Sequence, residues 1–230
     1  MTDLSSLALM QGPLTDSDFA RLSPNRLRRR RRIRRAVDLI VAVPALVLTA
    51  PLWAVVTLMI SLADRGPVLF RQVREGRDGR PFEMVKFRSM YIDSDRRLAA
   101  YLEANPAARV EWETIYKLDP DPRILPVVGE FLRRSSLDEL PNLLNVIRGD
   151  MTLVGPRPFP DYHLQAYSPA LRTLRSSVTP GLTGVWQVVR GGVEVQEACD
   201  IHYLRNTSWR FDLKLMLQTI PLLIKGKSHF

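Results

Sequence analysis

An unbroken apolar run dominates the pattern of hydrophobic and polar positions along the chain. Residues 39–63 contain no charged side chain over 25 positions. At about 1.5 Å per residue, an α-helix of this length is long enough to cross a hydrocarbon core of about 30 Å. The run begins well inside the chain and is too long for a cleavable signal peptide, so we expect a retained membrane segment.

Two prolines, Pro44 and Pro51, interrupt this run. A proline inside a helix removes a backbone hydrogen bond and bends the helix. Both flanks of the run are rich in arginine, whereas a spanning helix usually carries its basic excess on one side. These patterns leave two readings open: a segment that bends near Pro51 and returns to the cytoplasmic side, and a kinked helix that spans the membrane.

Two shorter runs with strand character follow, at residues 67–74 and 81–88, on either side of an Asp-Gly pair. This arrangement predicts a β-hairpin. Strand periodicity places Lys86 and Arg88 on the same face of the second strand. The two cations could bind a phosphate there or could solvate an edge strand, which is the commoner use.

A leucine-rich helix, with apolar residues at i, i+3, i+4 and i+7, is predicted to end at Gly149. Ser136 and Glu139 have the spacing of a capping box at its start. Pro141 leaves open whether Ser136 or Asp138 is the N-cap, because a proline beyond the first turn removes a hydrogen bond.

Two adjacent carboxylates, Asp138 and Glu139, stand at the start of this helix. Acidic residues favour a helix N-terminus through the helix dipole, so the pair alone does not indicate a site. After a short apolar run at residues 151–154, the sequence Gly-Pro-Arg-Pro places Arg157 between two prolines. The prolines fix the backbone, so we expect the turn to aim the Arg157 side chain.

Further elements complete the expected pattern. Residues 93–105 and 209–217 have the periodicity of helices, and we expect the second either at the membrane interface or on the domain core. Residues 185–188 are predicted to form a short strand. The sequence therefore indicates an α+β domain attached to a membrane segment.

The charge is concentrated in one place. The chain of 230 residues carries a net charge of +9, and eight of its 33 Lys and Arg residues lie in residues 26–35, which leaves 25 against 24 Asp and Glu. A basic cluster directly before a membrane segment is typical of contact with anionic lipid headgroups. We therefore expect anionic membrane lipid, and no nucleic acid, as a partner. The single cysteine, Cys199, excludes an internal disulfide and a CxxC metal site.

Several rare motifs occur in an order that resembles the bacterial sugar transferase family, the monotopic phosphoglycosyl transferases that start glycan assembly on a polyprenyl phosphate. The resemblance extends with gaps from about residue 34 to residue 226. The matching stretches are the apolar segment with Ala-Pro at its middle, PVLFRQVREGRDGRPFEMVKFRSM, LRRSSLDELPNLLNVIRGDMTLVGPRP, VTPGLTGVWQV and DIHYLRNTSWRFDLKLM.

The resemblance and the patterns together predict three parts. Residues 1–33 form a mobile tail that ends in the arginine patch, and residues 34–65 form a re-entrant helix broken at Pro51. Residues 66–230 form a catalytic domain with the hairpin and with amphipathic helices on the membrane surface. The resemblance places both ends of the re-entrant helix and the catalytic domain on the cytoplasmic side of the bacterial inner membrane.

The resemblance also implies a reaction. A phosphosugar passes from a UDP-sugar to undecaprenyl phosphate with release of UMP, as the first membrane step of exopolysaccharide, capsule or O-antigen synthesis. Asp138 matches the nucleophile that forms a covalent phosphosugar intermediate. It also matches the position that binds Mg²⁺, and Glu139 assists as ligand or base.

Cations and a turn proline are expected to hold the substrates. After Trp186-Gln187-Val188 the family often has Gly-Arg, whereas this chain has Val189 and Arg190, so it stays open whether Arg190 takes over that position. Ala50 stands where a serine usually precedes the breaking proline. A non-enzymatic membrane-anchored protein that binds lipid or a partner, and a membrane glycosyltransferase that releases UDP, are the alternative functions. The oligomeric state is not readable, and a homo-oligomer stays open. The expected substrate-binding residues are Lys86, Arg88, Arg133, Pro156, Arg157 and Arg190.

Overall fold

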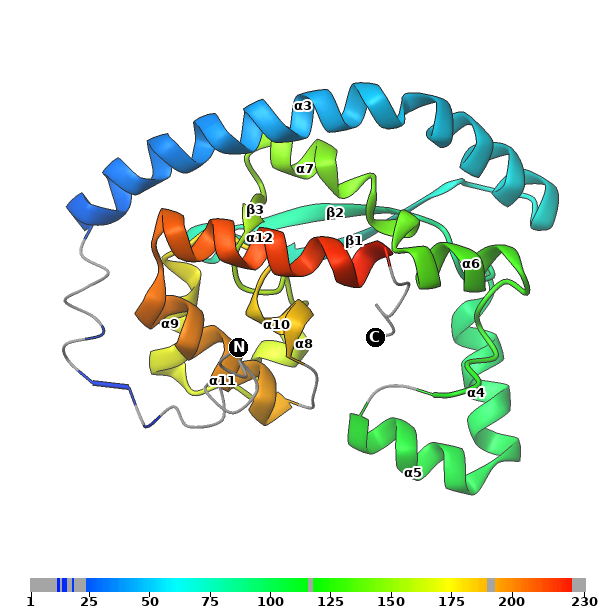
Figure 1. Ribbon diagram of the computed structural model, residues 1–230. Helices are drawn as coiled ribbons and strands as arrows, with labels where there is room; N and C mark the ends of the chain where they lie inside the picture. Colours follow the sequence, from blue (N-terminus) through cyan, green and yellow to red (C-terminus); the bar gives the residue numbers. More distant parts are fainter. Residues whose placement is uncertain are drawn as a thin grey trace.

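The longest helix, α3 (Pro24–Ala63), arches over the rest of the molecule (Figure 1). The computed structural model describes residues 12, 14, 15, 18, 24–115, 118–189 and 193–224. Within α3, the stretch Arg31–Ala63 is long and apolar enough to cross a membrane by length and composition. The helix is continuous through Pro44 and Pro51, so a re-entrant turn at Pro51 stays a prediction.

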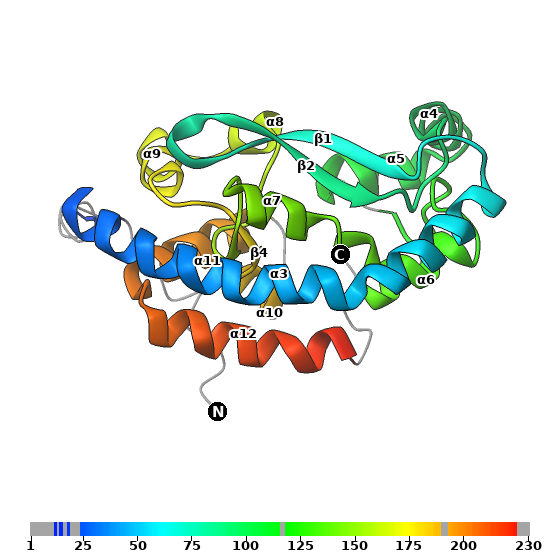
Figure 2. The same ribbon diagram turned by 90° about the horizontal axis from the view of Figure 1, so that it is seen from above.

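Two small sheets accompany the helices, so the expected α+β class is confirmed. Strands β1 (Leu69–Glu75) and β2 (Pro81–Phe87) form the predicted antiparallel hairpin, and η1 (Arg77–Gly79) forms its tip. Strands β3 (Thr152–Val154) and β4 (Gly181–Thr183) pair in parallel. In Figure 2, α7 lies between the hairpin and α12.

Most of the remaining described chain is helical. The predicted helices at residues 93–105 and 209–217 are confirmed as α4 and α12, and α12 continues past Pro221. The helices after the hairpin are α4 (Ser94–Ala104), α5 (Pro106–Ile115), α6 (Val128–Ser135), η2 (Leu137–Glu139), α7 (Asn142–Arg148), α8 (Asp161–Leu164), α9 (Pro169–Ser176), α10 (Val185–Val188), α11 (Val193–Asn206) and α12 (Trp209–Ile224).

The predicted strand at residues 185–188 is wrong, because these residues form the single helical turn α10. The backbone N–H of Val189 donates to the carbonyl of Val185 at 2.9 Å and closes the turn. The side chains of Val185 and Trp186 are buried. The turn therefore inserts two adjacent apolar residues into the core, which the alternating side chains of a strand would not do.

The structure describes part of the predicted tail, and the mobility of the tail stays a prediction. Residues 24–33 belong to α3. Asp18 is buried and pairs with Arg205 of α11 at 2.9 Å. Of the predicted tail, Asp18 therefore contacts the domain, and residues 24–33 are helical before the apolar segment begins.

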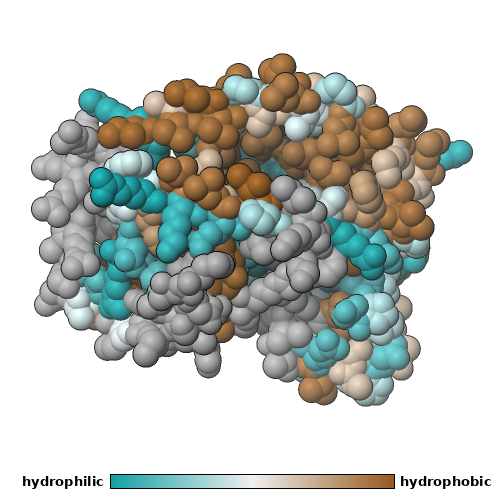
Figure 3. All heavy atoms as spheres, viewed as in Figure 1, coloured by the Kyte–Doolittle hydropathy of each residue, from teal (hydrophilic) through white to brown (hydrophobic). Residues whose placement is uncertain are grey.

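Helix α3 is part of the domain core as well as an apolar outer edge. Ala42, Val56 and Ile60 are fully buried, and they belong to two hydrophobic clusters that include side chains of the domain. Exposed apolar side chains of the same helix include Leu48 and Leu62, each 79% exposed. Figure 3 shows apolar residues gathered along the upper edge of the molecule, over α3.

Two arginines of the basic patch attach α3 to the domain. Arg34 pairs with Asp212 of α12 at 2.7 Å and donates to the Thr207 hydroxyl at 2.6 Å. Arg35 donates to carbonyl oxygens in the last turn of α7. The expectation that the patch faces lipid headgroups is therefore corrected at these two positions.

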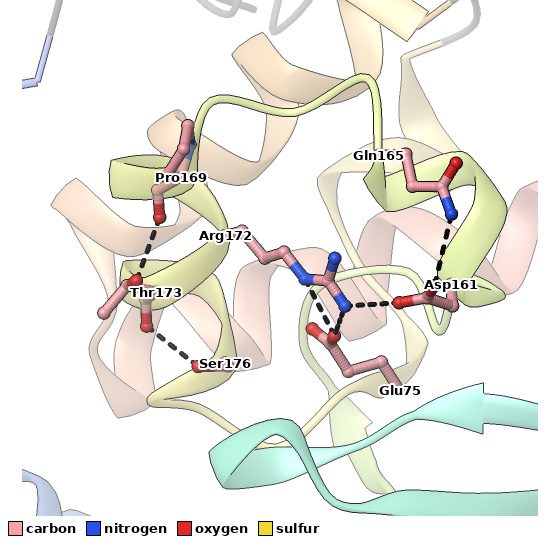
Figure 4. A network of polar contacts seen from close by, with 7 residues as sticks. All are labelled: Glu75, Asp161, Gln165, Pro169, Arg172, Thr173 and Ser176. Atoms are coloured by element: carbon pink, nitrogen blue, oxygen red, sulfur yellow. Dashed lines mark hydrogen bonds and ion pairs between the residues drawn. The ribbon is translucent and has the colours of Figure 1, made fainter.

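An arginine of α9 ties the hairpin to the start of α8 (Figure 4). Arg172 donates to the Glu75 carboxylate at 2.6 and 3.0 Å and also pairs with Asp161. The backbone N–H of Glu75 donates to the carbonyl of Phe159 at 3.0 Å. This network holds the end of β1 beside the segment that follows Arg157.

Candidate active site

The two adjacent carboxylates lie on the 3₁₀ turn η2, between α6 and α7. Ser136 ends α6 in a left-handed conformation (φ 56°), and its N–H donates to the Arg133 carbonyl. Its side chain makes no capping hydrogen bond, and α7 begins after Pro141. The predicted capping box is therefore wrong. Asp138 and Glu139 are presented on a separate turn instead of inside a helix.

The predicted C-terminal end of the leucine-rich helix is confirmed. Gly149 has φ 91°, and its N–H donates to the carbonyls of Asn145 and Val146. A residue with a Cβ rarely adopts this conformation, so glycine ends the helix at low cost. Asn145 and Val146 are the most deeply buried positions of α7. The buried face of α7 is therefore centred on Asn145 and Val146 and not on the apolar positions at i, i+3, i+4 and i+7 that the sequence predicted.

The Asn145 side chain fixes α7 to the free edge of the hairpin. Its amide oxygen accepts from the N–H of Val85 at 3.1 Å, and its amide nitrogen donates to the carbonyl of Glu83 at 2.6 Å. An unpaired strand edge needs such partners when it is covered. This contact sets Lys86, the next residue of β2, against η2.

Lys86 and Glu139 form an ion pair at the centre of the site. The Lys86 Nζ lies 2.5 Å from the Glu139 Oε1, and the two side chains are 23% and 16% exposed. The alternative in which Lys86 only solvates an edge is therefore excluded. A partly buried ion pair is screened less than a surface pair, so it strongly influences neighbouring charges.

The carboxyl group of Asp138 has a raised pKa. Burial raises the pKa of its carboxyl group to about 6, and the neighbouring Glu139 charge acts in the same direction. Lys86 and Arg133 lower this pKa and oppose the effect. Arg133 thus lies near Asp138, and its predicted contact with a substrate phosphate stays a prediction. A carboxyl group tuned in this way is typical of functional sites.

Close packing of glycine backbones shapes the turn that carries Arg157. A Cβ atom on Gly155 would lie 2.5 Å from the carbonyl oxygen of Thr179, and one on Gly184 would lie 2.2 Å from the carbonyl oxygen of Gly155. The N–H of Gly181 donates to the carbonyl of Pro156 at 2.8 Å. The absence of side chains on these glycines lets the backbone at residues 179–184 pack directly against the turn that carries Arg157.

Aromatic and charged neighbours then orient Arg157. Its guanidinium lies 5.0 Å from the ring centre of Trp186, whose indole N–H donates to the Gly155 carbonyl at 3.2 Å. Arg175, paired with buried Asp200 at 2.7 Å, donates to the Arg157 carbonyl. Burial lowers the pKa of Arg157, and the Glu139 charge opposes that shift. Arg157 therefore lies within electrostatic range of Glu139, and its role in substrate binding stays a prediction.

Two residues of the site were missed by sequence reasoning. Burial lowers the pKa of Arg74 to about 10, and its nearby charges include Arg157 and Glu139. The Arg74 Nε is buried without a hydrogen-bond partner among the described residues. Burial also lowers the pKa of His163, and the charges of Arg74 and Arg157 act in the same direction. The influence of Glu139 on Arg74, and of Arg74 and Arg157 on His163, joins residues far apart in the sequence that no local pattern connects.

The remaining predicted substrate residues are placed differently. Arg88 is buried and pairs with Asp64 at 2.8 Å, so we assign it to anchoring the end of α3 instead of to substrate binding. Pro156 is buried in the turn before Arg157. Arg190 lies outside the described residues.

The carboxylates of Asp138 and Glu139 could bind a magnesium ion only if a substrate supplied further ligands. Among the residues that the structure describes, no group of three or more acidic, histidine or cysteine side chains could hold a metal. Asp138 and Glu139 offer two carboxylates, and Lys86 occupies one oxygen of Glu139. Mg²⁺ commonly binds one or two carboxylates together with waters and substrate phosphates. The pair therefore fits a Mg²⁺-diphosphate complex and not a closed protein cage.

The sequence profile of the bacterial sugar transferase family matches residues 29–226. The chain belongs to the bacterial sugar transferase family. Family membership makes it an enzyme of the phosphoglycosyl transferase class, and both η2 and the Arg157 turn lie inside the matched region.

Similar members of this family have curated names. The exopolysaccharide production protein ExoY of Sinorhizobium fredii is 41% identical over 86% of this chain and 88% of the relative. The UDP-glucose:undecaprenyl-phosphate glucose-1-phosphate transferase of Caulobacter vibrioides is 40% identical over 83% of this chain and 69% of the relative. The UDP-galactose-lipid carrier transferase of Erwinia amylovora is 39% identical over 84% of this chain and 40% of the relative.

Proposed function

We propose that this sugar transferase moves a phosphosugar from a UDP-sugar to undecaprenyl phosphate and releases UMP. The product would be the first lipid-linked intermediate of an exopolysaccharide, capsule or O-antigen. The observation that carries this proposal is the position of Asp138, a carboxyl group with a raised pKa among Lys86, Arg133 and Glu139. Names of the relatives, which include both substrates, support the choice of donor and acceptor.

In the first step, an Asp138 carboxylate oxygen attacks the β-phosphorus of the UDP-sugar. A new bond forms between that oxygen and phosphorus, while the bond to the oxygen bridging the two phosphates breaks, and UMP leaves with the electron pair. A phosphosugar-aspartyl intermediate results. A carboxylate nucleophile of this kind divides one difficult displacement into two easier ones.

In the second step, a phosphate oxygen of undecaprenyl phosphate attacks the same phosphorus. The bond to Asp138 breaks, the carboxylate is restored, and the sugar diphospholipid is formed. Because phosphorus carries negatively charged oxygens in both steps, preorganised cations stabilise the transition states. Lys86, Arg133 and Arg157 supply that charge in this proposal, and Arg74 adds to it.

Magnesium would complete the charge balance. Asp138 and Glu139 are the residues that would hold Mg²⁺, which supplies Lewis-acid stabilisation of phosphate oxygens when it is bound. Glu139 remains attached to Lys86 through one oxygen. This attachment keeps the side chain of Glu139 directed at the site.

The membrane arrangement belongs to the same proposal. We place α3 in the inner membrane as a re-entrant helix that bends near Pro51, so that both of its ends and the catalytic domain face the cytoplasm. The exposed apolar face of α3 supports burial in lipid, and arginines before and after the apolar run support cytoplasmic placement of both ends. Exposed Trp209, Leu213 and Leu217 on α12 would lie at the membrane surface.

Nucleotide release tests the reaction directly. Detergent-purified protein is supplied with Mg²⁺, undecaprenyl phosphate and a panel of UDP-sugars, and the parent is compared with Asp138→Asn. The matched control is Asp95→Asn, which removes an exposed carboxylate of α4. We expect UMP from the parent and the control, and none from Asp138→Asn.

A second measurement without acceptor tests the intermediate. The intact mass of the parent should increase by one phosphosugar after mixing with the donor, and Asp138→Asn should show no increase. UDP in place of UMP would favour a glycosyltransferase that moves only the sugar. UMP release by Asp138→Asn would remove Asp138 as the nucleophile, and no nucleotide release across a broad panel would favour a non-enzymatic role.

A further inference from the structure

An arginine-rich cavity lies between α3 and the domain, separate from the residues around Asp138. Its volume is about 220 Å³, and four parts of the chain surround it: the first turns of the α3 membrane segment, the hairpin tip, the α7–β3 connection and the end of α9. Drug-sized ligands need roughly 300–1,000 Å³, so this cavity suits a smaller group. Its lining includes Arg31, Arg34, Arg35, Asp38, Arg77 and Arg148.

The charge of the lining is strongly positive. Its one acidic side chain, Asp38, accepts hydrogen bonds from the Thr152 hydroxyl and the Leu153 N–H, both at 2.9 Å. Among the lining residues this leaves one negative charge against five arginines, two of which are paired with carboxylates outside the lining. A concave surface of this kind concentrates positive potential and attracts anions.

Two of the five arginines retain free hydrogen-bonding capacity. Arg34 is paired with Asp212, Arg35 donates to the end of α7, and Arg77 is paired with Asp78. Within the described part of the chain, neither Arg31 nor Arg148 has a carboxylate partner. The two lie on different elements, α3 and α7, and both line the cavity. Arginines that converge from two elements without an acid are suited to a phosphate, which guanidinium groups bind with two parallel hydrogen bonds.

The cavity also has a defined position along α3. It is lined by residues 31–38, which directly precede the apolar run at residues 39–63. A group bound there lies where the apolar part of the helix begins, at the level of lipid headgroups if α3 enters a bilayer. Asp138, Glu139, Lys86 and Arg157 are absent from its lining.

We propose that this cavity is a second anion site, which binds a phosphate group through Arg31 and Arg148. The phosphate can come from an anionic phospholipid headgroup or from free phosphate. The inference is independent of the transfer reaction, since its evidence is the cavity and its charges. Its failure would leave the proposed function intact.

Thermal unfolding of the full chain in a neutral detergent tests the site. The protein is titrated with short-chain phosphatidylglycerol, short-chain phosphatidylcholine or inorganic phosphate at constant ionic strength. We expect phosphatidylglycerol, inorganic phosphate or both to raise Tm in the parent, and Arg31→Gln with Arg148→Gln to raise the midpoint concentration about a hundredfold. That factor corresponds to the loss of two charge-assisted contacts at about tenfold each.

A matched double variant separates the site from general charge. Arg32→Gln with Arg109→Gln removes the same charge from two exposed arginines, one of them adjacent to Arg31, and neither lines the cavity. Stabilisation by phosphatidylglycerol alone would assign the site to a headgroup, and stabilisation by inorganic phosphate as well would assign it to phosphate from either source. Equal effects of the two double variants, or no stabilisation by either anion, would overturn the proposal.

Discussion

The Asp138 carboxyl group experiences opposing influences from its neighbours. Burial and Glu139 raise its pKa to about 6, while Lys86 and Arg133 lower it. A nucleophile must be ionised to attack phosphorus, so the balance among these groups sets the pH at which the enzyme becomes active. The carboxyl group is thus positioned by η2 and tuned by residues from β2 and α6.

The rate of UMP release should fall about tenfold per pH unit below pH 6, because the ionised fraction of Asp138 falls in that proportion. Replacement of Lys86 by Gln removes a cation that lowers this pKa, so the acid limb should move to higher pH. The measurement is kcat/KM between pH 5 and pH 8. Lys214→Gln on α12 is the control and should leave the limb in place, and an unmoved limb in Lys86→Gln would contradict this assignment.

Arg74 should contribute to substrate binding although its sequence context does not indicate it. Arg74→Gln is expected to lower kcat/KM for the UDP-sugar by about 10- to 100-fold, the range for loss of one charge-assisted hydrogen bond. Arg71→Gln on the same strand removes an exposed arginine that pairs with Glu83. Equal losses in the two variants would mean that Arg74 acts only through general charge.

Sequence reasoning was most informative where the backbone of a residue depends on its immediate neighbours. Arg157 was singled out because prolines on both sides fix its backbone, and the charge of Glu139 does act on the pKa of Arg157. Arg88 was predicted on the face shared with Lys86, yet it pairs with Asp64. Strand periodicity gives the face of a side chain but not the partner beyond it, which is why Arg88 and Arg74 could not be assigned from local pattern.

At the scale of elements, the confirmed predictions rested on long periodic patterns or on distinctive turn residues. The hairpin followed from an Asp-Gly pair between two runs, and the end of α7 followed from Gly149. Element α10 has four residues, too few to show a helical period, and its conformation is set by burial of Trp186. The capping box failed because Ser136 adopts a left-handed conformation that ends the preceding helix.

The contact between α3 and β3 depends on one buried carboxylate. Asp38→Leu should destabilise the protein by about 1–3 kcal/mol, because the Leu153 N–H would be buried without its acceptor. Asp38→Asn retains an acceptor oxygen and should cost less. Thermal unfolding in detergent measures both. Equal losses for the two variants would show that the acceptor is not what stabilises this contact.

At the scale of the whole molecule, α3 has two environments along its length. One side contributes Val56 and Ile60 to a core cluster, and the opposite side exposes large apolar residues. Length and composition predicted the membrane segment, but they could not predict that it also closes the core of the domain. That second role depends on contacts with residues distant in the sequence, such as Phe87 and Leu132.

Cysteine labelling distinguishes a re-entrant α3 from a spanning one. The natural Cys199 is buried, and burial raises the pKa of its thiol to about 12, so it should react slowly with maleimides. Arg32→Cys and Asp95→Cys place single thiols before and after the apolar run. With a re-entrant helix, a membrane-impermeant maleimide should label both in inside-out vesicles, whereas a spanning helix would leave one of them unlabelled there.

The contact between Arg35 and the last turn of α7 sets an order of events during synthesis. Arg35 leaves the ribosome first, and its acceptor Val146 follows 111 positions later. At about 5–20 residues per second, this interval lasts roughly 6–22 s. During that time the apolar residues of α3 are exposed without the domain that later packs against them, and a bilayer offers the surroundings they need. Membrane insertion of the nascent chain should therefore come before the catalytic domain folds.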